Sequence, residues 1–214
     1  MRALIVLGGD APGEALLSRC MRESDLVIAA DSGLAAFDRA GLSPDLLVGD
    51  MDSVDSAILS RYEGRVPERR LSPIKDDTDG VDAVDLAIAR GAKEITLLGA
   101  LGGRLDHALA NVMLLVRAYR KGARARILTE AERIVRVCAE ERLQGAEGDT
   151  VSLLPLGTAR GVTLLGFFYP LKDATLDSDY PLGVSNVVTD SEAIVRAREG
   201  DLILFHRFDG RDRG

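Results

Sequence analysis

Hydrophobic positions in the first part of the chain form short, nearly continuous runs. These runs are ALIVL at 3–7, LVIAA at 26–30, DLLVG at 45–49, EITLLGA at 94–100 and ARILT at 125–129. Alanine-rich or amphipathic segments with helical spacing lie between them. Apolar runs that alternate with helical segments are typical of buried parallel strands joined by helices. We therefore expect an α/β domain with a parallel sheet over residues 1–129.

The hydrophobic pattern changes after about residue 130. The apolar runs become β-rich and follow one another closely. Turn residues are predicted between them at Gly148 and Asp149, Gly157, Pro170, Gly183, and Gly200 with Asp201. Such spacing leaves no room for crossover helices and favours antiparallel pairing. We expect a small antiparallel domain, a sandwich or a barrel, over residues 130–214.

Charge and cysteine content narrow the range of functions. The chain has 27 Lys and Arg against 34 Asp and Glu, a formal net charge of −7, which argues against non-specific binding to nucleic acid or to an anionic membrane. The two cysteines, Cys20 and Cys138, lack metal-ligand spacing, and the apolar run after Arg2 is too short for a secretion signal or a membrane span. We expect reduced thiols in a cytoplasmic protein.

Two aspartates follow the third apolar run directly. If the strand continued through them, Asp50 and Asp52 would project to the same face, because residues two apart in a strand do so. Their carboxylates would repel each other and favour a shared cation such as Mg²⁺. The alternative is that Asp50, Asp52 and Ser53 cap a helix suggested by residues 53–62. A role as helix cap explains one of these aspartates well but explains two of them poorly.

A second acidic cluster lies at the start of a helix predicted in KDDTDGVDAVDLAIARG, residues 75–91. Asp76 and Asp79 are candidates for a functional site, but carboxylates also stabilise a helix N-terminus, and Asp79 with Asp82 resembles a capping arrangement. Lys75 is either a phosphate or substrate contact or a surface charge. Asp82 and Asp85 fall on the outer face, where a solvated role is expected.

The third candidate site is a glycine-rich turn that leads into a helix, in residues 97–119. The turn contains Gly99, Gly102 and Gly103, and the predicted apolar stripe of the helix consists of Leu105, Leu109, Val112 and Val116. Backbone N–H groups at such a turn bind phosphate. The sequence is not a Walker loop, since no Gly-Lys-Ser or Gly-Lys-Thr follows.

A polar stripe on the same helix starts beside this turn. Arg104, His107 and Asn111 recur at spacings of three and four and so share one face. Arg104 can bind phosphate through two hydrogen bonds. The alternatives are an N-cap role for Asp106 and a structural role for His107. Taken together, three strand ends supply groups suited to a Mg²⁺-bound polyphosphate, as phosphoryl transfer requires.

In their order along the chain these segments resemble the thiamine pyrophosphokinase family. The motifs are ADSG at 30–33, GDMDS at 49–53, DDTD at 76–79 and GGRLDH at 102–107, with YPLKDATL at 169–176 and GVSN at 183–186 in the second half. The resemblance implies an α/β catalytic domain followed by a β-sandwich domain that binds thiamine. It also implies a homodimer with thiamine between the subunits, and transfer of pyrophosphate from ATP to thiamine with release of AMP.

The resemblance also implies roles for individual residues. The metal ligands would be Asp50, Asp52, Asp76 and Asp79. The catalytic residues would be Asp50, Asp52, Asp79 and Asp106. The ATP-binding residues would be Asp31, Ser32, Gly33, Gly102, Gly103, Arg104, His107 and Asn111. The thiamine-binding residues would be Lys75, Ser185 and Asn186.

Several positions depart from the family pattern. Ser32 stands where many members have glycine, Lys75 where some have glutamine, and Val187 where glutamate is common. The chain has no Trp to stack on thiamine, for which Phe168, Tyr169 or Tyr180 are possible substitutes. Two alternatives stay open: a pyrophosphokinase for another hydroxymethyl heterocycle such as a pterin, and a nucleotide- or thiamine-binding regulatory module without turnover.

Overall fold

The computed structural model describes residues 1–70, 78–180 and 182–209. The chain divides into two compact units, Met1–Glu130 and Ala131–Gly214, and each is described by itself. The predicted site residues Lys75 and Asp76 lie outside the described residues. No helix in the described part of the chain combines the length and the apolar character that crossing a membrane requires.

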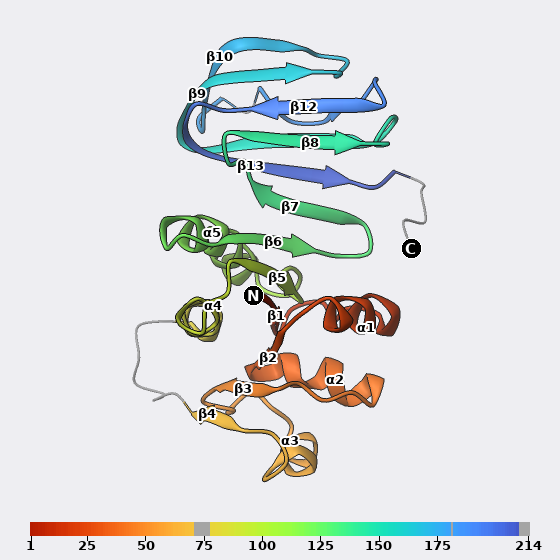
Figure 1. The fold of residues 1–214 in the computed structure, drawn as a ribbon, viewed down its shortest axis with the longest axis vertical. Coiled ribbons are helices and arrows are strands. Elements are labelled where there is room, and N and C mark those ends of the chain that lie inside the picture. The colour runs from red at the N-terminus through yellow and green to blue at the C-terminus, as the bar shows by residue number, and fades with distance from the viewer. Residues whose placement is uncertain (71–77, 181, 210–214) are drawn as a thin grey trace. The chain divides into compact units, whose positions relative to one another are not determined.

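The first unit is built on a parallel sheet (Figure 1). Its order is β4-β3-β2-β1-β5-β6, and every neighbouring pair is parallel. The strands are β1 (Arg2–Val6), β2 (Leu26–Ala30), β3 (Leu46–Gly49), β4 (Glu68–Arg70), β5 (Glu94–Leu98) and β6 (Arg124–Leu128). The expected α/β fold is confirmed. Strand β4 was not predicted, because its three residues are all charged and give no apolar signal.

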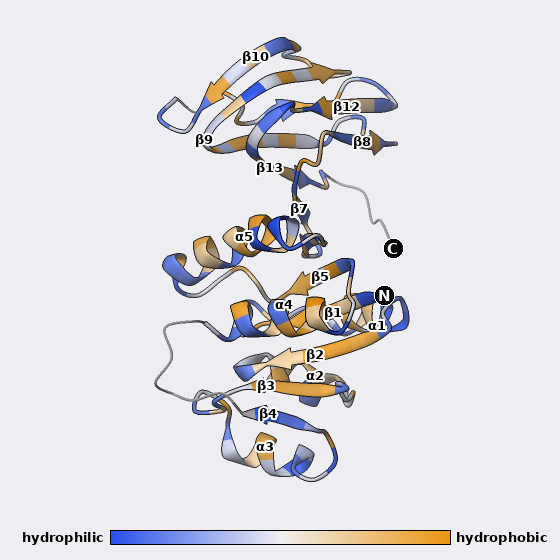
Figure 2. Cartoon of the chain, turned by 60° about the vertical axis from the view of Figure 1, so that its left-hand side comes forward, coloured by the Kyte–Doolittle hydropathy of each residue, from blue (hydrophilic) through white to orange (hydrophobic). Residues whose placement is uncertain are grey.

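Helices cover both faces of this sheet. On one face, α1 (Glu14–Arg22), α2 (Leu34–Ala40) and α3 (Ser56–Tyr62) contribute to a core with side chains of β1, β2 and β3. Helix α4 (Asp79–Ala89) packs on β1, β2 and β3 from the other side, and α5 (Leu105–Arg120) packs on β6 and α4 (Figure 1). Covered on both faces, β2 and β3 are buried throughout and continuously hydrophobic (Figure 2).

The strand order places a crevice at the carboxyl ends of the strands. Strand β1 has β2 on one side and β5 on the other, so the chain leaves β1 in one direction and later returns to its opposite edge. Ligands of open α/β sheets bind where the strand order reverses in this way. The loops that follow β1, β2 and β5 therefore meet at the position where the sequence places its candidate residues.

The predicted apolar stripe of α5 is wrong at its N-terminal end. Val112 and Val116 are buried, but Leu105 is 72% exposed and Leu109 is 53% exposed. In the described part of the chain, more than half of each of these two side chains is therefore left uncovered. The buried face is instead completed further along the helix by Leu114, Leu115 and Ala118.

The second unit is an antiparallel β-domain, as expected. Its strands are β7 (Glu132–Arg136), β8 (Glu140–Gln144), β9 (Thr150–Leu165), β10 (Leu171–Asp177), β11 (Asn186–Val187), β12 (Glu192–Arg196) and β13 (Glu199–Arg207). Strand β9 pairs with β13 and β11 in its first part and with β12 and β10 in its last part. Hydrophobic and hydrophilic residues alternate along β9 (Figure 2), and its buried side chains contribute to one apolar core.

Two predicted turns of this domain are wrong. The chain does not turn at Gly157, because β9 continues through this residue, which takes a φ of 84°. Gly200 lies inside β13 at an irregularity of its pairing with β9, also with positive φ. Glycine permits such local distortion without a chain reversal. In each case the sequence shows the glycine but not whether it bends a strand or ends one.

Asp85 joins α4 to α5 and does not have the solvated role that was expected. It accepts hydrogen bonds from Arg117 Nε and Nη2 at 2.8 and 2.6 Å and from Lys121 Nζ at 2.7 Å. Its side chain is 29% exposed. Hydrogen bonding to Arg117, aided by Lys121, lowers the pKa of Asp85 to about 2. The ionised carboxylate is therefore the form that stabilises the packing of the two helices.

We predict that Asp85→Asn lowers the free energy of unfolding by about 1 to 2 kcal/mol at pH 7. The pKa of Asp85 is lower in the folded protein than in the unfolded chain. The full difference in unfolding free energy between wild type and the variant is therefore present above the pKa of the unfolded chain. It should shrink as the pH falls below about 4 towards the folded value of about 2. Urea unfolding at several pH values measures it, with exposed Asp179→Asn as the control. A difference that did not change with pH would contradict the assignment.

Candidate active site

The floor of the candidate site is a junction of three loops held together by backbone contacts. Gly9 N donates to Gly99 O at 2.8 Å, and Asp10 N donates to Leu101 O at 2.6 Å, so the loop after β1 is bonded to the loop after β5. A Cβ on Gly9 would lie 2.1 Å from Leu101 O. Only glycine fits at such a distance. The close approach therefore depends on the residue type at Gly9.

The loop after β2 approaches the same junction. A Cβ on Gly33 would lie 2.1 Å from Val6 O, and a Cβ on Gly8 would lie 1.9 Å from Ser32 Oγ. The first contact is with backbone and the second with a side chain. Gly8 and Gly9 were not among the predicted site residues. The signal that marks them is the Gly-Gly pair directly after the first apolar run.

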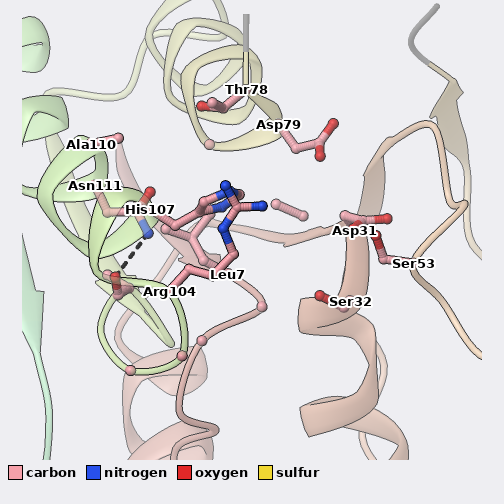
Figure 3. Close-up of a pocket in the computed structure, with 17 residues that line it drawn as sticks. Leu7, Asp31, Ser32, Ser53, Thr78, Asp79, Arg104, His107, Ala110 and Asn111 are labelled. Carbon is pink, nitrogen blue, oxygen red and sulfur yellow. Dashed lines mark hydrogen bonds between the residues drawn. The ribbon is translucent and has the colours of Figure 1, made fainter. Parts of the chain in front are cut away.

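A cavity of about 380 Å³ opens above this junction (Figure 3). Asp31, Ser32 and Ser53 lie on one side of it, and Arg104, His107 and Asn111 lie opposite, on the side of α5. The structure thus brings together most of the residues that the sequence assigned to ATP. Its lining comprises Leu7, Gly8, Gly9, Ala30, Asp31, Ser32, Ser53, Thr78, Asp79, Gly80, Ala100, Gly102, Gly103, Arg104, His107, Ala110 and Asn111.

Three carboxylates converge beside the cavity. Asp31, Asp50 and Asp52 each place one oxygen within 4.8 Å of the others. The predicted reason for this proximity is wrong, because β3 ends at Gly49 and does not continue through the pair. A turn brings them together instead: Met51 has a φ of 65°, and Asp52 N donates to Asp50 Oδ1 at 3.0 Å.

Helix capping does not account for this acidic pair. The N-cap of α3 is Asp55, whose Oδ1 accepts from Ala57 N at 2.7 Å. Asp50 and Asp52 are therefore not required for the helix. Like charges held this close destabilise the protein unless a cation is shared between them. Carboxylate oxygens are ligands that Mg²⁺ prefers.

Asp31 belongs with this acidic group by position. It has a φ of 45°, and its Oδ1 is buried without a hydrogen-bond partner in the described part of the chain. A Cβ on Gly49 would lie 3.2 Å from Asp31 Cβ, so this glycine lets the end of β3 approach Asp31. A buried carboxylate oxygen without a partner is costly. Asp31 is thus suited to a cation as well as to the nucleotide contact expected from sequence.

Asp79 faces the same acidic group from the start of α4. It is not the cap of this helix, as the sequence suggested, because Thr78 Oγ1 accepts from Val81 N at 3.4 Å. Burial, followed by the charges of Asp31 and Asp50, raises the pKa of Asp79 to about 6. A cation bound beside these carboxylates would offset their negative charge.

Arg104 and Asp106 form an exposed pair at the start of α5. Arg104 donates to Asp106 through Nε at 3.1 Å and Nη2 at 2.6 Å. These hydrogen bonds from Arg104 lower the pKa of Asp106 to about 2. The N-cap position belongs to Arg104, whose side chain makes no capping bond, so the alternative of an N-cap role for Asp106 is wrong. Asp106 is a weak base that orients a guanidinium.

The other two members of this polar stripe have different surroundings. Asn111 Nδ2 donates to Ala100 O at 2.8 Å and so ties the glycine-rich loop to α5 (Figure 3). His107 is exposed and lines the cavity. This position favours a ligand contact for His107 over the alternative of a histidine bonded within the fold.

The remaining predicted residues lie in the second unit. Ser185 has a φ of 59°, and its N–H donates to Ser152 Oγ at 3.0 Å. Asn186 is buried, with 6% exposed. Its side chain bonds the backbone of Tyr169, accepting from the N–H at 3.0 Å and donating to the carbonyl at 2.8 Å.

Comparison with known families matches both units. A sequence model described as the thiamin pyrophosphokinase catalytic domain matches residues 17–127, more than half of the chain. The chain belongs to the thiamine pyrophosphokinase family. A second model of the family, described as its vitamin B1 binding domain, matches residues 135–201. The cavity thus lies in the part matched by the catalytic model, except for its lining residues of the loop after β1.

Individual relatives agree with this membership. The chain is 28% identical to the thiamine pyrophosphokinase of Bacillus subtilis over 191 residues, which cover 87% of this chain and 89% of that protein. The crystal structure of the Bacillus subtilis protein has a TM-score of 0.85 at 25% identity, covering 98% of this chain and 100% of that one. The structure from Geobacillus thermodenitrificans has a TM-score of 0.83 at 26% identity, with 99% and 100% coverage.

The close contacts at Gly8 and Gly9 predict which alanine substitution a second substitution at Ser32 can compensate. Gly8→Ala should lower the free energy of unfolding by about 1 kcal/mol, because the new methyl group displaces the Ser32 hydroxyl. Adding Ser32→Gly should restore it, since the next atom in the way of that methyl, Gly33 N, would be 3.8 Å away. Urea unfolding of the single and double variants measures this coupling.

Gly9→Ala is the matched control. Its methyl group would meet the backbone oxygens of Leu101 and Gly99 at 2.1 and 2.6 Å, so we expect a loss of about 3 kcal/mol or more. Ser32→Gly should not restore it. Equal rescue of Gly8→Ala and Gly9→Ala, or rescue of neither, would contradict the geometry of the junction.

Proposed function

We propose that this protein is a Mg²⁺-dependent thiamine pyrophosphokinase, which transfers pyrophosphate from ATP to the hydroxyl of thiamine and releases AMP. The observation that carries the proposal is the convergence of Asp31, Asp50 and Asp52 beside a glycine-lined cavity, in a chain that belongs to this family. Acids for a cation, backbone donors and an arginine are the components that phosphoryl transfer needs.

The donor set fits Mg²⁺. Asp50 and Asp52 would hold the ion, with Asp31 and Asp79 next to them and Asp76 as a further proposed ligand. All are hard oxygen donors, and Asp31 Oδ1 is buried without a hydrogen-bond partner in the described structure. When bound, the ion would neutralise charge on the triphosphate. Burial is the main cause of the raised pKa of Asp79, and the ion would offset the second cause, repulsion from Asp31 and Asp50.

The opposite side of the cavity would position the nucleotide. Arg104 supplies a guanidinium held by Asp106, and His107 and Asn111 line the same face. Gly102 and Gly103 leave backbone groups accessible at the start of α5, and Ser32 with Gly33 would complete the site from the loop after β2. A guanidinium oriented in advance binds phosphate with less loss of entropy. Asp106 therefore acts mainly by orienting Arg104.

The chemistry requires no nucleophile from the protein. The thiamine hydroxyl attacks the β-phosphorus, AMP leaves, and the chain contributes alignment of the two substrates. The second unit would bind thiamine through the segment that contains Ser185 and Asn186, and Lys75 would contact the substrates. A homodimer with thiamine between subunits and a cytoplasmic location are further parts of the proposal.

The reaction is tested by separating the nucleotide products formed from ATP and Mg²⁺ with thiamine as acceptor. AMP in equal amount to thiamine diphosphate is expected. ADP as the product would contradict pyrophosphate transfer. A panel of other hydroxymethyl heterocycles, including a pterin, tests the acceptor, and a preference for one of these would overturn the choice of thiamine. Binding of ATP and thiamine without any turnover would favour a regulatory module instead.

We predict that Asp50→Asn and Asp52→Asn each reduce kcat by roughly a hundredfold or more, because each removes a preorganised charge from the metal site. Asp55→Asn is the matched control: it removes one charge nearby, but asparagine caps a helix as well as aspartate does. Its activity should stay within about twofold of wild type. Unfolding curves verify that all three variants fold. Full activity in Asp52→Asn would remove the metal assignment.

A further inference from the structure

The loop after β1, residues 7–13, forms part of the floor of the cavity. Gly8 and Gly9 of this loop line the cavity, and Asp10 N donates to a carbonyl of the loop after β5 at 2.6 Å. The side chain of Asp10 also lies against that second loop, since a Cβ on Gly102 would be 2.1 Å from Asp10 Cγ. A displacement of the loop after β1 would therefore displace Gly102, which lines the cavity as well.

The far end of the same loop is held by a residue from a distant part of the chain. Glu130 Oε1 accepts a hydrogen bond from Gly13 N at 2.7 Å, although the two residues are 117 positions apart. Glu130 follows the end of β6 and is the last residue of the first unit. Only Ala11 and Pro12 lie between Asp10 and Gly13, and the ring of the proline fixes its backbone angle φ. The course of the loop is thus fixed from both ends.

Glu130 supplies an acceptor that the start of α1 lacks. The N-cap residue is Gly13, which has no side chain to form a capping bond. In a capping box, the third residue of the helix is Glu or Gln, and its side chain accepts from the backbone N–H of the N-cap residue. That position in α1 is taken by Leu16, which is buried in the core. The bond that a capping box forms within one helix therefore joins α1 to the end of β6.

We propose that Glu130 is a positioning residue for ATP: by holding Gly13, it keeps Gly8 and Gly9 in place at the floor of the cavity. The inference rests on the proposed function. Glu130 is exposed and is not among the described residues that line the cavity, so it acts through the loop and not by contact with the nucleotide. Backbone groups that are fixed before a ligand arrives lose less entropy when it binds.

The competing role for Glu130 is stabilisation of α1 alone, because a carboxylate is favourable at the positive end of a helix dipole. Both roles predict a slightly less stable protein when the carboxylate is removed, so stability does not distinguish them. Substrate dependence does: loss of a helix cap lowers stability only, whereas a displaced loop weakens the binding of ATP and not that of thiamine. The contacts of Asp10 with the loop after β5 favour the positioning role, since they connect the held loop to the cavity floor.

The role of Glu130 is tested with two substitutions at this position. Glu130→Ala removes the bond and should raise the KM for ATP about fivefold, while kcat and the KM for thiamine stay within about twofold of wild type. Glu130→Gln keeps an oxygen that can accept from Gly13 N, so its KM for ATP should stay within about twofold of wild type. Titration calorimetry with Mg²⁺ and a non-hydrolysable ATP analogue gives the same comparison without turnover.

Asp25→Ala is the matched control. Asp25 Oδ2 accepts from Arg2 N at 2.8 Å, so it is also an exposed carboxylate bonded to a backbone N–H, but at the start of β1 and not at the end that faces the cavity. This variant should lose a similar amount of stability in urea unfolding and keep the wild-type KM for ATP. Unchanged ATP affinity in Glu130→Ala, or an equal loss in Asp25→Ala, would overturn the inference and leave the proposed function standing. Failure of the wild type to form AMP would instead contradict the proposed function.

Discussion

Backbone contact between the loops after β1, β2 and β5 is the constraint on which the candidate site depends. A Cβ on Gly9, Gly33 or Gly99 would lie only 2.1 to 2.2 Å from a backbone carbonyl oxygen of another segment, far inside van der Waals contact. The loops can meet only because these residues are glycine. Their contact closes the floor of the cavity and fixes the positions from which Asp31, Ser32 and Arg104 project.

The site combines this closely packed floor with acidic side chains that repel one another. Asp31, Asp50, Asp52 and Asp79 lie close together, and the raised pKa of Asp79 reports the cost of placing negative charge there. The buried, continuously hydrophobic strands behind the site supply the stability that allows this cost. On the other side of the cavity, the positive charge of Arg104 and the negative charge of Asp106 largely offset each other. Such an arrangement suits a cation and a polyanion bound together, as in the metal nucleotide of the proposed function.

Much of the fold was predicted because its signals are local. The strands of the first unit are apolar runs, and β4 was missed because it lacks one. The proximity of Asp50 and Asp52 was predicted for the wrong reason: it depends on the left-handed conformation of Met51, which no hydrophobic pattern reveals. The exposure of Leu105 and Leu109 was missed because a helical stripe does not show which turns of the helix are covered in the fold.

Roles that depend on hydrogen-bond partners could not be predicted from the sequence either. Thr78 and Asp55 cap their helices, so the neighbouring aspartates are left for another purpose. Asn186 is expected from the resemblance to contact thiamine, and in the structure both ends of its amide bond the backbone of Tyr169. Spacing identifies which residues can come together. Whether a polar side chain binds a ligand or supports the fold can be judged only from the hydrogen-bond partners of its atoms.

Anomalous diffraction from crystals grown with Mn²⁺ and a non-hydrolysable ATP analogue tests the central claim most directly. The account predicts a metal peak within coordination distance of the carboxylates of Asp50 and Asp52, with the triphosphate in the cavity between this metal and Arg104. A metal bound away from these aspartates, or a nucleotide bound outside the cavity, would contradict it.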